Sequence, residues 1–151
     1  MTTSPTERFE YVEADPLLGS ASALPYAPIT LQFGGRETRV SALVDSGSTL
    51  NVLPYDVGLQ LGAVWEQQTV PVRLGGRMAD SEARAILLIG AIRRFAPVRL
   101  AFAWTRNNRV PVILGQTNFF SWSSIFGSAV RSCSLKSRRA ARSVADGDAG
   151  L

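Results

Sequence analysis

The sequence predicts an all-β fold, mainly antiparallel, built as a small barrel or sandwich with one or two short helices. Short runs rich in valine, isoleucine, tyrosine and phenylalanine recur along the chain, and glycine, proline or asparagine separates them. The 151 residues suffice for one domain with a hydrophobic core but not for two. With 46% hydrophobic and 19% charged residues, the composition is that of an ordinary globular protein.

The first predicted elements are two strands and a helix. Residues 27–33 and 37–44 alternate or run apolar, and the glycine pair at 34–35 is typical of a hairpin turn between them. Residues 54–62 predict a short helix, because proline is tolerated in a first helical turn and glycine is a common stop signal.

The second half predicts a long hairpin with a glycine-rich tip, two further strands and a second short helix. These elements fall at residues 68–74, 81–90, 93–104, 109–115 and 116–122. The aromatic cluster at 119–126 favours a helix that packs on the barrel or on a partner chain. Met78, Phe95, Phe102 and Trp104 could line a pocket, but the aromatic residues are interpreted as core, as aromatic residues in strands usually are.

The basic character of the chain is concentrated near its end. Net charge is +4, and residues 128–151 hold five cations and only two acids, so the rest is nearly neutral. The cations are Arg131, Lys136, Arg138, Arg139 and Arg142. We therefore expect an N-terminal extension at 1–25, a folded domain at 26–127 and a basic, disordered tail at 128–151, with a transient helix near 136–145. A solvated tail is favoured over a nucleic-acid-binding arm.

The residue inventory excludes several kinds of chemistry. The single cysteine, Cys133, precludes an intramolecular disulfide and fits a reducing, cytoplasmic compartment. The absence of histidine removes Ser-His-Asp and Cys-His catalysis and the usual zinc sites, so we expect no metal and no cofactor. The N-terminal residues do not resemble a signal peptide, and the apolar run at 85–92 is too short to span a bilayer, so no membrane association is expected.

The stretch ALVDSGSTLNVLP, residues 42–54, places one acid at the end of an apolar strand. Asp45 enters a Ser-Gly-Ser turn, after which the chain becomes apolar again. One interpretation is a surface turn, because aspartate, serine and glycine are common turn residues. The other is a catalytic carboxylate held on a rigid loop.

The motif resembles that of the retropepsin-like aspartic proteases, in a bacterial or retroelement-like form. The residues that carry the resemblance are Leu43, Val44, Asp45, Ser46, Gly47 and Ser48, followed downstream by Ile113, Leu114 and Gly115. The likeness covers residues 26–125 and includes a glycine-rich hairpin where that family has its flap. It implies a closed barrel that works as a C2 homodimer, an aspartic endopeptidase acting on polypeptides, and a substrate-binding flap formed by Leu74, Gly75, Gly76 and Arg77.

Peptide hydrolysis without metal, histidine or nucleophilic cysteine requires a base for water and an acid for the carbonyl oxygen. Two carboxylates that share one proton supply both. The chain has one Asp-Ser-Gly motif, so the pair must be Asp45 and its mate across a two-fold axis. The resemblance implies that Gly47 lets its N–H approach the carboxylate, that Ser46 hydrogen-bonds across the axis, and that Ser48 lies against the carboxylate.

Two departures from the family pattern stand out. Viral members carry an arginine after the second glycine, paired with an aspartate that follows the catalytic one. Here Gln116 and residues 49–51 hold those positions, so both partners of the pair are missing. The flap is also polar, with Arg77 and Asp80 near its tip. Two other functions remain open: a catalytically silent retropepsin-fold domain for dimerisation or peptide binding, and a basic-tailed β domain associated with nucleic acid.

Overall fold

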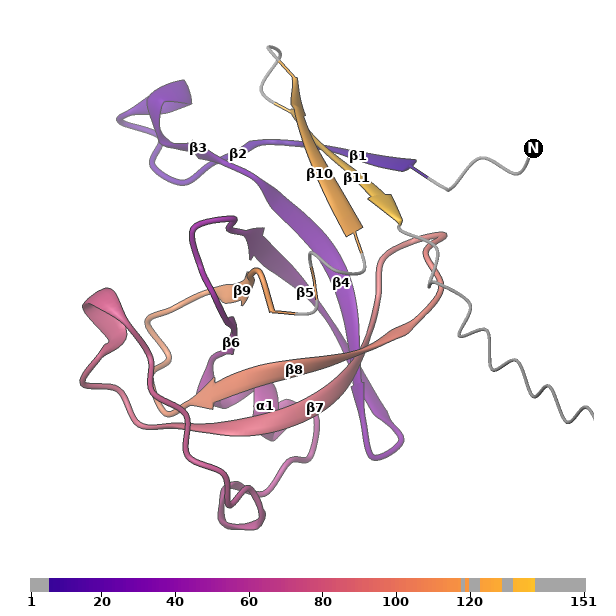
Figure 1. The fold of residues 1–151 in the computed structure, drawn as a ribbon. Helices are drawn as coiled ribbons and strands as arrows, with labels where there is room; N and C mark the ends of the chain where they lie inside the picture. The colour runs from indigo at the N-terminus through magenta and orange to yellow at the C-terminus, as the bar shows by residue number, and fades with distance from the viewer. Residues whose placement is uncertain (1–5, 118, 120–122, 129–131, 138–151) are drawn as a thin grey trace, which may run out of the picture.

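The fold is a closed six-stranded barrel with a small sheet and a two-stranded arm at one side (Figure 1). The structure is a computed structural model that describes residues 6–117, 119, 123–128 and 132–137. The barrel strands follow the order β4-β5-β9-β6-β8-β7. Most neighbours are antiparallel, while β5 with β9 and β6 with β8 are parallel. The predicted all-β class is therefore confirmed. Of the barrel and the sandwich that the sequence allows, the structure has the barrel.

The first predicted hairpin is present. β4 (Tyr26–Phe33) pairs with β5 (Arg36–Val44) along its whole length. Gly34 and Gly35 in the turn have φ angles of 53° and 84°. A two-residue turn with both φ angles positive matches the twist of its strands, and glycine adopts it without steric cost.

The short central elements also lie where the sequence places them. β6 (Asn51–Leu53) leads into α1 (Tyr55–Gln60), and β9 (Val112–Leu114) lies beside β6. Pro54 caps α1, and Gly62, just beyond the helix, has a φ angle of 77°. The predicted helix at 54–62 is thus confirmed in a slightly shorter form.

The long hairpin is only partly as predicted. β7 (Ala83–Ala91) and β8 (Val98–Thr105) form a regular antiparallel pair. Residues 68–74 follow η2 (Trp65–Gln67) and run beside β7, but they make an isolated bridge at Pro71 and no strand. The glycine-rich tip contains a 3-10 turn, η3 (Gly76–Met78).

Prolines explain where the strands end. Proline has no N–H for a strand ladder. Pro97 precedes the observed start of β8, and Pro111 precedes β9. The strands expected at 93–104 and 109–115 are consequently shorter than predicted. Pro71 is itself the bridging residue of the 68–74 segment, and the hydrogen bonds to β7 come from its neighbours Val70 and Val72.

A second sheet joins the two ends of the chain. β1 (Thr6–Glu10) pairs with β11 (Ser132–Ser137), which pairs with β10 (Ser123–Ser128), all antiparallel. Two expectations were wrong here: residues 123–126 are strand and not helix, and residues 132–137 are strand and not part of a disordered tail. The β1–β11 pairing is remote in sequence, and local composition carries no trace of such a partner. Most of the predicted helix at 116–122 lies outside the described residues, as does most of the one near 136–145.

The N-terminal extension also contains a short two-stranded projection. We call residues 12–24 the arm: β2 (Val12–Glu13), η1 (Gly19–Ser22) and β3 (Ala23–Leu24).

In the barrel core, Phe95, Phe102 and Trp104 are all buried, as interpreted from the sequence. Within the described part of the chain, no helix is long and apolar enough to cross a membrane.

Candidate active site

Both sequence motifs meet at one end of the barrel. Asp45 directly follows β5, and Gly115 directly follows β9, which runs parallel to β5 with Val44 opposite Leu114. The backbone N–H of Asp45 donates to the carbonyl of Leu114 at 3.0 Å. The parallel pairing therefore places the acid of the first motif beside the glycine of the second.

The Asp45 side chain is oriented by its own loop. The N–H of Gly47 donates to Oδ1 of Asp45 at 2.9 Å, and the N–H of Ser48 donates to the carbonyl of Asp45 at 3.2 Å. A Cβ on residue 47 would lie 3.2 Å from that carboxylate oxygen, so glycine permits the expected close approach. The result is a half-buried carboxylate with a fixed orientation.

Asn51 supports the second motif, a role that the sequence analysis missed. Its Oδ1 accepts from the N–H of Gly115 at 2.7 Å, and its Nδ2 donates to the carbonyls of Ala101 and Thr117 at 2.9 and 3.1 Å. The side chain is 1% exposed. Buried polar groups are almost always hydrogen-bonded, so an asparagine inside an apolar run was the available signal.

Hydrogen bonds from residues 116–117 brace the Asp45 loop, residues 45–49, at the place where viral members use an ion pair. The side chain of Gln116 donates to the carbonyl of Ser46 at 2.8 Å, and its N–H donates to the carbonyl of Ser48 at 2.8 Å. The N–H of Thr117 donates to the carbonyl of Thr49 at 2.9 Å. A neutral amide therefore holds the loop without a buried charge.

The two serines differ from each other in their surroundings. The hydroxyl of Ser48 donates to the carbonyl of Leu50 at 2.7 Å, although the residue lines the same cleft as Asp45. Ser46 is exposed. Its expected hydrogen bond across a two-fold axis stays a prediction, because the structure describes one chain.

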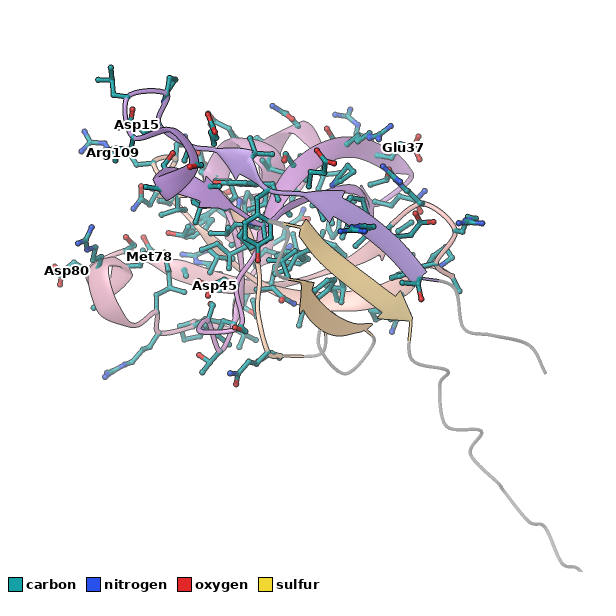
Figure 2. The ribbon with its side chains drawn as sticks, turned by 90° about the horizontal axis from the view of Figure 1, so that it is seen from above. Asp15, Glu37, Asp45, Met78, Asp80 and Arg109 are labelled. Carbon is teal, nitrogen blue, oxygen red and sulfur yellow. The ribbon has the colours of Figure 1, made fainter. Side chains whose placement is uncertain are left out.

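A cleft of about 340 Å³ separates the Asp45 loop from the flap. Seven of the predicted site residues line it: Asp45, Gly47, Ser48, Leu74, Gly75, Gly76 and Ile113. Thr49, Leu50, Val52, Arg73 and Met78 complete the lining. Figure 2 shows Met78 and Asp45 on the same side of the molecule. Arg77 was expected to line the cleft, but the flap cation among the lining residues is Arg73.

The flap is fixed at its base. The carbonyl of Glu82 accepts from the N–H of Arg106 at 3.2 Å and from the hydroxyl of Thr105 at 2.9 Å. The guanidinium of Arg84 donates to the backbone carbonyl of Trp65 at 2.8 Å and also packs over the indole ring of Trp65. The exposed tip around Gly76, which has a φ angle of 60°, thus projects from a rigid base over the cleft.

Other potential sites offer fewer groups for catalysis or metal binding. A larger hollow, about 450 Å³, lies at the β4–β5 turn, at the end of that hairpin opposite Asp45. No group of three or more Cys, His, Asp or Glu residues that could hold a metal ion occurs in the described ranges. The cleft beneath the flap is therefore the candidate active site.

Comparisons with known proteins place the fold. A retropepsin-like aspartic protease from Rickettsia conorii matches with a TM-score of 0.59 at 11% identity, over 89% of this chain and 94% of that one. The retroviral protease-like domain of Ddi1 from Leishmania major matches with a TM-score of 0.52 at 16% identity, over 70% of this chain and 82% of that one. No protein-family model and no curated protein matches. The chain therefore has the closed-barrel fold of the retropepsin-like aspartic proteases.

Proposed function

We propose that the protein is an aspartic endopeptidase whose catalytic pair is Asp45 from each of two chains. One observation carries the proposal: Asp45 lies on a braced Asp-Ser-Gly loop, with its carboxylate held by the N–H of Gly47, at a cleft beneath a flap. A surface turn would need neither the buried Asn51 nor the backbone contact with Leu114. The fold is similar to that of a retropepsin-like aspartic protease.

The reaction follows from a shared proton. Two carboxylates close together hold one proton between them, because both cannot be ionised at that distance. The ionised carboxylate removes a proton from water as the water oxygen bonds to the peptide carbonyl carbon. The protonated carboxyl gives its proton to the carbonyl oxygen. Collapse of the resulting tetrahedral diol, with protonation of the leaving nitrogen, breaks the C–N bond and restores the pair.

The lining of the cleft fits an extended polypeptide. Leu50, Val52, Met78 and Ile113 offer apolar contact, which favours an apolar side chain near the scissile bond. Gly75 and Gly76 of the flap tip line the same cleft, so an extended peptide bound there would lie against the flap backbone.

Substitution Asp45→Asn tests the proposal. The amide preserves the shape of the side chain and its bond from Gly47, but it cannot act as a base, so hydrolysis of an unfolded protein mixture should be abolished. Asp56→Asn, at the exposed start of α1, is the control and should remain active. Circular dichroism and sedimentation should be unchanged in both variants.

Hydrolysis by Asp45→Asn at close to the wild-type rate would rule out the proposed mechanism. A wild-type protein that binds peptides in the cleft without cleaving them would instead identify a peptide-binding module of the same fold.

A further inference from the structure

The arm presents an unusual set of exposed apolar side chains. Leu17 is 95% exposed and Leu18 is 63% exposed, both at its tip. Val12 and Leu24, also exposed, are directly paired across β2 and β3, so their side chains share one face. Single exposed leucines are ordinary, but four exposed apolar side chains on one short projecting element indicate a contact surface.

Leu17 and Leu18 lie in a turn at the tip of the arm that is held by its own hydrogen bonds. Oδ1 of Asp15 accepts from the N–H of Leu17 at 2.9 Å, and the carbonyl of Asp15 accepts from the N–H of Leu18 at 3.1 Å. The hydroxyl of Ser22 donates to the carbonyl of Gly19 at 2.7 Å and accepts from the N–H of Asp15 at 3.0 Å. The polar groups are satisfied within the turn while its apolar side chains face outward.

The arm rises from the catalytic end of the barrel. Its last residue, Leu24, precedes Pro25, whose carbonyl accepts from the N–H of Val44 at 2.9 Å. Val44 is the residue before Asp45. Figure 1 shows the arm and the Asp45 loop after β5 at the same end of the barrel, and Figure 2 shows Asp15 on the same side as Asp45 and the flap.

We propose that the arm is a dimer clasp that packs Leu17 and Leu18 against a second copy of this chain. The inference rests on the proposed function, which requires a two-fold axis beside Asp45. A two-fold axis beside Asp45 places both arms at the interface between the two chains. By symmetry, the contact between an arm and the partner chain then occurs twice. A stable interface buries about 800 Å² per partner around an apolar centre. The small, polar Asp45 loop cannot supply that area alone, and the arm adds four apolar side chains.

Other occupants fit the arm less well. Leu17 and Leu18 are not among the residues that line the substrate cleft. The arm carries two acids, Glu13 and Asp15, and no cation, so an anionic lipid surface would repel it. A second copy of the chain fits the location of the arm, at the end of the barrel that carries Asp45.

The test is the double substitution Leu17→Asp and Leu18→Asp in the full chain, with Leu59→Asp as the matched control. Leu59 is an exposed leucine of α1, outside the arm. Sedimentation velocity over a dilution series should show a dimer for wild type and control. The double variant should raise the dimer dissociation constant at least tenfold, because two charges would have to be buried in an apolar contact. Its specific activity should recover at high protein concentration.

A second variant and several readouts keep the outcomes separate. Leu17→Ala with Leu18→Ala should weaken the dimer by a smaller factor without adding charge, and circular dichroism should match wild type. A dimer constant unchanged by both double variants would overturn the clasp. So would an altered KM at an unchanged dimer constant, or wild-type binding to neutral phosphatidylcholine vesicles that the variants lose. Loss of dimerisation in a protein that never hydrolyses peptides would support the clasp while rejecting the peptidase.

Discussion

At the scale of single residues, the site depends on close backbone approach. Gly115 has no room for a side chain, because a Cβ there would meet the carbonyl oxygens of Leu50 and Ser48. Both carbonyls belong to the segment that carries Asp45. The second glycine motif therefore sets the distance between the end of β9 and the Asp45 loop, and the hydrogen bond from Gly115 to Asn51 holds that distance.

Gly115→Ala should lower both activity and stability. The new methyl group would force the loop away from β9 and strain the bond from Gly115 to Asn51, at a cost of about 1–3 kcal/mol, as for other overpacked sites. Gly75→Ala is the control, because a Cβ at that flap position meets nothing within 4 Å. Urea unfolding measures the free energies, and equal midpoints for the two variants would contradict the close-contact account.

At the scale of elements, one buried carboxylate ties the N-terminal strand to the barrel. Glu7 of β1 is 6% exposed and pairs with Arg94 at 3.0 Å and with Arg93 at 3.3 Å, in the connection between β7 and β8. Arg93 also packs over the ring of buried Phe9. The three-stranded sheet that β1 shares with β11 and β10 is thereby fastened to the barrel.

This attachment of β1 should be sensitive to acid. Hydrogen bonds from Arg94, and then from Arg93, lower the pKa of Glu7 from its ordinary value of 4.5, although burial acts in the opposite direction. A carboxyl whose pKa is lower in the folded state stabilises the protein above its unfolded pKa, and this contribution is lost as pH falls through the folded pKa. The stability gap between wild type and Glu7→Gln should therefore be full at pH 7 and shrink below about pH 4.5.

Chemical unfolding from pH 7 to pH 3 measures that gap. Glu10→Gln, an exposed position of the same strand, is the control and should differ little from wild type across the range. A gap for Glu7→Gln that stays constant with pH would show that its ion pairs do not hold β1.

At the scale of the whole molecule, the proposed enzyme has half a catalytic site in each chain. Specific activity should fall when the protein is diluted below its dimer dissociation constant. Only a singly protonated pair has both a base and an acid, so activity should depend on pH with a bell-shaped profile that has its maximum on the acid side. A chelator should have no effect, because the proposed reaction uses no metal.

Peptide hydrolysis measured over a protein dilution series and a pH series tests these expectations together. Constant specific activity on dilution would require a second carboxylate within one chain. A rate that rises above pH 8, or that a chelator removes, would mean that something other than paired carboxylates activates the water.

Much of the barrel could be predicted from the sequence because its signals are local. The Gly34-Gly35 turn, the strands on either side of it, helix α1 and the Asp45 loop are each encoded within a few neighbouring residues. Turn chemistry and strand alternation act over that distance. The single Asp-Ser-Gly motif, with no histidine and one cysteine in the chain, likewise restricts the candidate chemistry through residue types alone.

Only the tertiary structure decided which distant segments meet. The pairing of β1 with β11, the alignment of Val44 beside Leu114, and the bonds of Asn51 to Gly115, Ala101 and Thr117 all join residues far apart in the chain. Strand formation depends on the partner that satisfies the backbone, and a partner remote in sequence leaves no local pattern. The structure also shows that Arg73 lines the cleft and that Arg77, in the 3-10 turn of the flap, does not.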